Sequence, residues 1–333
     1  MNYINYVKQS PMMGVIGYGG GATSLGRFSA GGAAPGPGYW DGGRILAAGG
    51  DNGGNISKIS YIGATGSSLS TFGNLVTSRL GFGGASNGER VVWSSGQDSG
   101  GYTTSTIDYV TSSSTGDATD FGEDIGNWGY TANLSDSTTA VMGGGWNGSS
   151  RSNNMRYVTI ATTGNATNFG DLVAAGSAGG GCCNGTRGIF AGIKPAPGTD
   201  YNIIQYLTVA TPANATDFGN LTQQRWGVGA CANSTRAVFG GGYGSPSTMD
   251  YVTISSTGNA SSFGTMSPSG NGNAGASDAS QSGASGRGYF VGGEGSSGAF
   301  RYIDISSTGS SSSMATLSGH GNNNYIAAGS GNS

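Results

Sequence analysis

The residues that most often carry catalysis are scarce in this chain of 333 residues, which contains one histidine and three cysteines. His320 is the sole candidate for the general base of a Ser-His-Asp triad, and it stands in the stretch SGHGNNN near the C-terminus. A single histidine in such a stretch is more often a loop residue than a base. We therefore expect no nucleophilic catalysis of this type.

Cysteine and metal chemistry are equally limited. Cys182, Cys183 and Cys231 cannot all pair within the chain, and Cys182 and Cys231 occupy the same place in neighbouring repeats. We expect them to be small buried residues, with a vicinal disulfide or a metal site as the alternatives. Because zinc and copper sites need several histidine or cysteine ligands, we predict no metal and no cofactor.

The densest acidic cluster comprises Asp117, Asp120, Glu123 and Asp124. A glycan-cleaving enzyme needs two facing carboxyl groups, but Asp120 belongs to a repeated turn and recurs as Asp217. Calcium binding by such a cluster is the alternative, because calcium prefers oxygen ligands. We predict that the protein is not an enzyme.

Aromatic residues within variable, polar loops favour recognition instead. Aromatic rings among Asn, Ser and Gly suit stacking on sugar rings with hydrogen bonding around them. The alternative is that these rings pack between structural units. The candidate ligand-binding residues are Trp146, Tyr102, Tyr243 and Trp226.

A repeat must position these loops. A tyrosine opens a β-branched strand at intervals of 45 to 51 residues, and a Gly-containing turn then leads to an aromatic residue, as in YVTISSTGNASSFG. This period matches a four-stranded propeller blade of about 40 to 50 residues. The tyrosines are Tyr61, Tyr109, Tyr157, Tyr206, Tyr251 and Tyr302, and the aromatic anchors are Phe72, Phe121, Phe169, Phe218 and Phe263, with Met314 in the last unit.

A second signature, an apolar run entering glycines, precedes each tyrosine and is typical of a strand buried on both faces. Its first residue is usually arginine, with Thr139 as the exception. We expect these arginines to cap or pair with neighbouring units rather than to bind a ligand, because one ligand site does not need five copies. They are Arg44, Arg90, Arg187, Arg236 and Arg287.

The fold class predicted from these repeats is an all-β propeller that occupies residues 1–333 as a single domain. Tyr325-IAAGSG looks like a seventh apolar strand, and Tyr6 matches the repeat tyrosine. We therefore expect seven four-stranded blades, with residues 1–43 and 318–333 jointly forming the closing blade; six or eight blades are the alternatives. Circular closure leaves no open sheet edge at the ends of the ring.

The order of apolar strand, Gly-Gly, variable loop, tyrosine and aromatic resembles the kelch repeat, although phenylalanine replaces the usual tryptophan. The YVTI-TGNATDFG pattern is more similar to Gly-rich repeats of predicted tail-fibre and virion structural proteins of tailed (cyano)bacteriophages. This resemblance implies a virion component that assembles in multiple copies with other virion proteins. Such a component either binds a host-surface glycan or serves as an assembled structural module. A repeat resemblance of this kind indicates the fold more strongly than the activity, because one fold can host many functions.

Composition narrows the partners further. A net charge of −3 with 9% charged residues provides no basic face for nucleic acid. The sequence has no apolar stretch long enough to span a membrane and begins without a signal-peptide pattern, so we expect a virion protein made in the host cytoplasm. The alternative is a secreted or cell-surface carbohydrate-binding lectin with an extracellular location.

Overall fold

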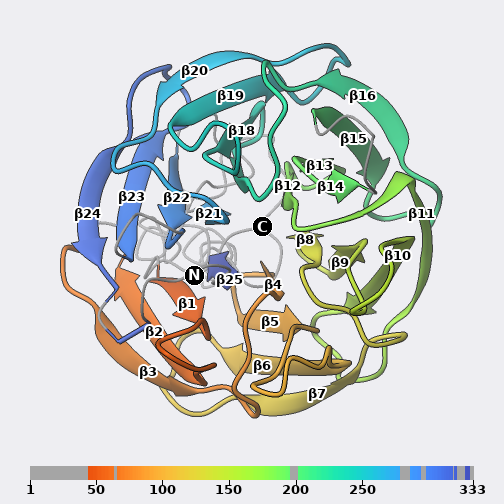
Figure 1. Cartoon of the computed structure of the whole chain (residues 1–333), viewed down its shortest axis with the longest axis vertical. Coiled ribbons are helices and arrows are strands. Elements are labelled where there is room, and N and C mark those ends of the chain that lie inside the picture. Colours follow the sequence, from red (N-terminus) through yellow and green to blue (C-terminus); the bar gives the residue numbers. More distant parts are fainter. Residues whose placement is uncertain are drawn as a thin grey trace, which may run out of the picture. The chain divides into compact units, whose positions relative to one another are not determined.

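A computed structural model describes most of the repeat region, and all of its described residues belong to the unit Pro37–Ser333 rather than to Met1–Gly36. The described residues are 44–63, 66–195, 202–277, 286–293, 298–317, 319–320 and 327–330. They form strands without a helix, arranged as the six antiparallel blades of a β-propeller (Figure 1). The all-β propeller prediction is therefore confirmed.

Each blade contains four strands in sequence order from the ring centre outward, apart from the closing strand β25. The innermost strands are β4 (Gly83–Ser86), β8 (Ala132–Ser135), β12 (Gly180–Cys183), β17 (Gly229–Ala232), β21 (Ala274–Ser277) and β25 (Ala327–Ser330). The second strands are β1 (Arg44–Ala48), β5 (Arg90–Ser94), β9 (Thr139–Gly143), β13 (Arg187–Ala191), β18 (Arg236–Gly240) and β22 (Arg287–Val291). The third strands are β2 (Lys58–Gly63), β6 (Thr106–Thr111), β10 (Ser152–Thr159), β15 (Ile203–Thr208), β19 (Thr248–Thr253) and β23 (Ala299–Asp304). The outer strands are β3 (Ser70–Asn74), β7 (Thr119–Glu123), β11 (Thr167–Ser177), β16 (Thr216–Asn220), β20 (Ser261–Thr265) and β24 (Ser312–Thr316), and β14 (Lys194–Pro195) adds a fifth strand beside β11.

The prediction of seven blades is wrong for the described strands, which form the six blades of the first alternative. The last strand, β25, pairs with β1 as the innermost strand of the first blade, so it completes a blade instead of starting one. Ser330 lies opposite Ile45 in the same way that Ser86 lies opposite Val91 in the next blade. Residues 1–43, assigned above to the closing blade, lie outside the described residues.

The four strand positions within a blade differ in burial for a simple geometric reason. The second strands lie within their sheets and between neighbouring blades, so all five residues except the first are buried, as in RILAA of β1. The outer strands bury chiefly the repeat phenylalanine, as in STFGN of β3. The apolar core is therefore divided into clusters that lie between and within blades.

The repeat tyrosines, phenylalanines and arginines form one recurrent contact. In five blades the tyrosine ring meets the phenylalanine ring edge to face, with centroids 5.7–6.1 Å apart. Each repeat arginine lies over the tyrosine of its own blade at 4.4–4.8 Å from the ring centroid. Arg44, Arg90, Arg187 and Arg236 also donate hydrogen bonds to backbone carbonyls of the following blade. Each of these four arginines thus connects the tyrosine–phenylalanine pair of its own blade to the next blade.

The turn between the third and outer strands clips each of the second to sixth blades to the outer strand of the preceding blade. At the first junction the N–H of Gly116 donates to the Phe72 carbonyl at 2.9 Å, and the Asp117 carboxylate accepts from the Asn74 N–H at 2.9 Å. A Cβ at Gly73 would overlap the Gly116 carbonyl, which explains the glycine after the phenylalanine. Equivalent close contacts join Gly122 to Gly164, Gly170 to Ala213, Gly219 to Gly258, and Gly264 to Gly309.

The junction between the last and first blades is built differently. Met314 and Ala315 on β24 replace the usual Phe-Gly pair, and Leu69 replaces the alanine of the repeat turn. These three side chains pack against one apolar cluster, and no hydrogen bond joins the described residues 66–69 to β24. Apolar packing therefore takes the place of the backbone clip at the seam of the ring.

Substituting the crowded glycine of one clip should destabilise the ring. Gly73→Ala should lower the free energy of unfolding by about 2 kcal/mol, because the new methyl group must displace the Gly116 backbone. Gly116→Ala is the matched control, since a Cβ there meets no atom within 4 Å, and its effect should stay within about 0.5 kcal/mol. Thermal or denaturant unfolding measures both, and equal stabilities of the two variants would contradict the clip.

Removing the closing strand should destabilise the first blade and the ring with it. Deleting residues 325–333 removes the four residue pairs between β25 and β1, which carry backbone hydrogen bonds of roughly 1 kcal/mol each. The free energy of unfolding should fall by roughly 4 kcal/mol in denaturant titrations. Deleting only residues 332–333 is the control and should leave the midpoint unchanged; a nine-residue deletion that unfolds like the full chain would disprove this closure.

Candidate functional site

A ring of buried polar side chains occupies the position just before each repeat tyrosine. Every one of them is nearly inaccessible to solvent and contacts the chain segment that enters its blade from the preceding blade. The sequence analysis missed this ring, although a polar residue precedes every repeat tyrosine. The residues are Ser60, Asp108, Arg156, Gln205, Asp250 and Arg301.

Three members of this ring form fully buried ion pairs. Arg79 lies 3.1 Å from Asp108, Arg156 lies 2.9 Å from Asp124, and Arg225 lies 2.8 Å from Asp250. Burial raises the pKa of Asp108 against the opposing charge of Arg79, and burial lowers the pKa of Arg79. Because each pair joins an entering segment to the third strand of its blade, these charges hold blades together.

Arg301 is the member of the ring that buries a guanidinium without a carboxylate partner among the described residues. Its Nη1 donates to the Pro268 carbonyl at 3.0 Å, and its Nη2 donates to the Gly292 carbonyl. Burial lowers the pKa of Arg301 to about 10. Backbone carbonyls thus take the place that a carboxylate occupies in three other blades.

The acidic cluster noted in the sequence is divided among structural tasks. Asp124 pairs with Arg156, Asp117 binds the backbone of β3, and Glu123 accepts a hydrogen bond from Ser105. Within the described residues no group of three His, Cys, Asp or Glu side chains could hold a metal ion.

His320 lies buried beside the first blade. It occupies the position that Arg79 holds in the second blade and Arg225 holds in the fifth blade. Its Nδ1 lies 2.9 Å from the Gly49 carbonyl, which can only accept, so Nδ1 carries the proton. Its Nε2 then accepts from the Ser60 hydroxyl at 2.8 Å. Burial is the main cause that lowers the pKa of His320, and the positive charge of Lys58 contributes.

The cysteines are free thiols in the described structure. Cys182 and Cys231 occupy equivalent positions on the innermost strands β12 and β17 and are buried. Burial raises the pKa of Cys182 well above its usual value and that of Cys183 to about 12. Since the thiolate is the reactive form, these thiols are poor nucleophiles and poor ligands at neutral pH.

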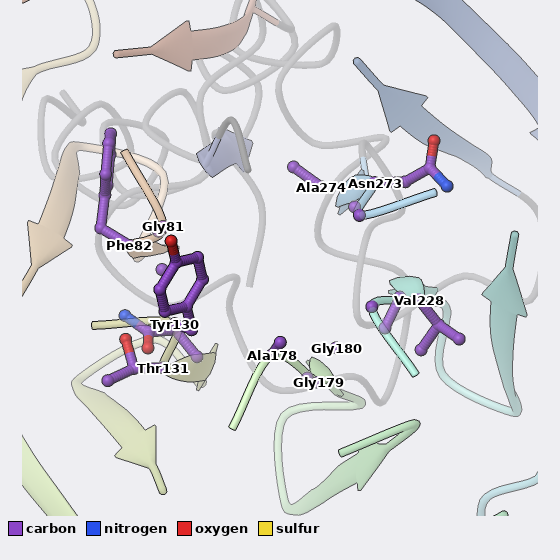
Figure 2. Close-up of a pocket in the computed structure, with 18 residues that line it drawn as sticks. Gly81, Phe82, Tyr130, Thr131, Ala178, Gly179, Gly180, Val228, Asn273 and Ala274 are labelled. Carbon is purple, nitrogen blue, oxygen red and sulfur yellow. The ribbon is translucent and has the colours of Figure 1, made fainter. Parts of the chain in front are cut away.

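The centre of the ring contains a small uncharged cavity of about 70 Å³. Figure 2 shows Phe82, Tyr130, Val228 and Asn273 around it, together with glycine-rich backbone of the innermost strands. Backbone hydrogen bonds run around its edge, including those from Ala178 to Tyr130 at 2.6 Å and from Gly227 to Ala178 at 2.7 Å. Pockets for drug-sized ligands are typically about 300–1,000 Å³, so this cavity is too small for a ligand of that size.

The loops after the second strands and the segments after the outer strands emerge on the same side of the ring, called here the loop face. All four sequence-predicted binding residues lie on it, but they are not brought into one pocket. Tyr102 is 75% exposed in a turn closed by Asp98, and it stands alone. Trp146 is half-buried and lies 6.3 Å from the Tyr130 ring.

Trp226 and Tyr243 stack on each other, with ring centroids 3.9 Å apart and an interplanar angle of 15°. The Lys194 ammonium lies 4.1 Å from the centroid of the Trp226 ring. Tyr243 covers one face of Trp226 and Lys194 covers the other, so no face of this indole remains for a sugar. Lys194 lies on β14, which pairs with β11 of the third blade, whereas Trp226 lies between the fourth and fifth blades. The sequence analysis did not single out Lys194.

The sequence matches no protein-family model and no curated protein. Function must therefore be argued from the residues themselves.

No helix of the described residues is long and apolar enough to cross a membrane.

The buried histidine should make the stability of the ring dependent on pH. An unfolded chain takes up the His320 proton near pH 6.5 and the folded chain only at lower pH, so the unfolded state binds more protons between these values. The melting temperature should therefore fall as the pH drops below about 6.5. His320→Gln should remove this component, which is measured as the difference between the two melting curves from pH 8 to 5; parallel pH dependences would exclude His320 as its source.

Proposed function

We propose that this chain is a non-enzymatic virion structural protein, carried on a tail fibre or capsid surface, that binds host-surface glycans through its loop face. The similarity of its repeats to those of predicted bacteriophage virion proteins supports the virion assignment. In this proposal the ring assembles in multiple copies with other virion proteins, and the described propeller serves host attachment.

One observation carries the binding role: all four exposed large apolar side chains of the described residues lie on the loop face. They are Val76, Tyr102, Ile125 and Val173, with exposed fractions from 45 to 75%. Val76, Ile125 and Val173 occupy equivalent positions four residues after the repeat phenylalanine. The described turns on the opposite face are rich in Gly, Ser, Thr, Asn and Asp and expose no large apolar side chain. Because the large exposed apolar side chains of the described residues all lie on the loop face, this face is the better candidate for an interaction site.

The use of the ionisable residues supports a binding protein over an enzyme. The three buried aspartates that pair with arginine, together with His320, hold segments of the frame in place. A glycosidase needs two carboxyl groups that flank a sugar bond, and the loop-face positions described above are filled instead by aromatic and apolar side chains.

The location is tested on purified virions. Mass spectrometry of gradient-purified particles, followed by immunogold imaging, should find the chain on the particle surface. Its recovery only from cell envelopes would favour the cell-surface lectin instead and would overturn the virion assignment.

Glycan binding is tested with the isolated protein on a glycan array. Trp146→Ala should reduce the signal of bound glycans by about tenfold, because stacking of a sugar ring on an indole is worth on the order of 1.5 kcal/mol. Thr162→Ala, in an exposed turn on the opposite face of the same blade, is the control and should bind like the wild type. Unchanged binding by Trp146→Ala would reject this tryptophan as a contact.

A further inference from the structure

The buried and repeated contacts that hold the blades together, called here the frame, use nearly all the positive charges of the described residues. Five arginines lie over repeat tyrosines, and four more are buried either as members of the polar ring or as partners of its aspartates: Arg79, Arg156, Arg225 and Arg301. Lys58 lies beside Gly319 and His320 at the first blade. Arg151 and Lys194 are left, and they lie together on the loop face.

A local elaboration brings these two cations together. The outer strand β11 runs for 11 residues, where the other outer strands have 5, and its end pairs with β14. Ser177 of β11 pairs with Lys194 of β14 and also accepts a hydrogen bond from Arg151 Nε at 3.3 Å. Neither the longer strand nor the added fifth strand occurs in the other described blades.

The two cations lie without a counter-charge among the residues that the structure describes. No ion pair to either side chain exists among the described residues. Burial and the neighbouring charge of Arg151 both lower the pKa of Lys194. Two adjacent, half-buried positive charges cost free energy unless an anion neutralises them.

Aromatic rings flank both cations. Lys194 rests on the Trp226 ring, which is held from its other side by Tyr243. Trp146 pairs with Arg151 across an isolated β-bridge, so their side chains emerge side by side. An indole next to a guanidinium provides a flat apolar surface beside a planar donor for two hydrogen bonds.

We propose that Trp146, Arg151 and Lys194 form a binding site for a saccharide that carries a carboxylate. The Arg151 guanidinium donates to the carboxylate, Lys194 adds a second positive charge, and the sugar ring lies against Trp146. This inference rests on the proposed glycan binding and specifies its ligand class. Trp226 and Tyr243 position Lys194 and do not contact the sugar.

The experiment compares acidic oligosaccharides with their uncharged methyl esters. Oligogalacturonate, oligomannuronate and sialyllactose, each with its ester, are titrated calorimetrically into the full-length protein at low and at physiological salt. At least one acid should bind tenfold or more tightly than its ester. Arg151→Gln combined with Lys194→Gln should remove this preference, whereas Lys58→Gln, a charge change elsewhere on the ring, should keep it. Circular dichroism checks that each variant is folded.

The outcomes separate this inference from the proposed function. Equal binding of acids and esters, reduced by Trp146→Ala, would overturn the carboxylate preference and leave glycan binding in place. Binding of no saccharide here or on the glycan array would overturn both. Inorganic sulfate or phosphate that binds as tightly as the oligosaccharides would show a simple anion site and overturn the inference, as would an acid preference retained in the double variant.

Discussion

The structure depends on covering the outer edge of every blade. A sheet edge leaves a row of N–H and C=O groups unpaired, and unpaired edges invite association with other strands. In this ring the turn between the third and outer strands of one blade supplies backbone and side-chain partners to the outer strand of the preceding blade. The same contact that protects an edge thus also fixes the next blade in position.

This constraint accounts for a sequence whose glycine content suggests disorder. The turn can approach the strand only where no Cβ intervenes, so a glycine follows the repeat phenylalanine at Gly73, Gly122 and Gly219. The junction between the last and first blades supports this explanation, because its described part lacks both the clip and the glycine. Where no such clip forms among the described residues, the position holds Ala315, and Leu69 and Met314 fill the space. Glycine occurs here because backbones crowd, and it disappears where they do not.

The sequence pattern was sufficient for the strands, for the tyrosine and phenylalanine positions and for the part of the C-terminal strand in closing the ring. It was insufficient for the blade count. Ala327–Ser330 was interpreted as a seventh copy of the apolar strand that stands second in each blade, whereas its pairing with β1 makes it the innermost strand of the first blade. The buried polar ring was also missed, since one polar residue inside a half-buried strand looks solvent-exposed. Trp226 shows the same limit at the loop face: its cover, Lys194, comes from another blade, and such a contact leaves no local trace in the sequence.

The described residues fall into two parts: a frame whose contacts recur around the ring, and a loop face whose residues differ from blade to blade. The frame repeats its contacts around the ring with little change in residue type, so a ligand that depended on them would meet several equivalent sites. The loop face carries a stacked aromatic pair in one blade, an isolated exposed tyrosine in another, and a fifth strand in a third. The turns that form the clips lie on the opposite face, so a change in one of these loops leaves the clips intact. Recognition chemistry can therefore vary on this face without loss of the fold, and a ligand should occupy part of the ring rather than its symmetry axis.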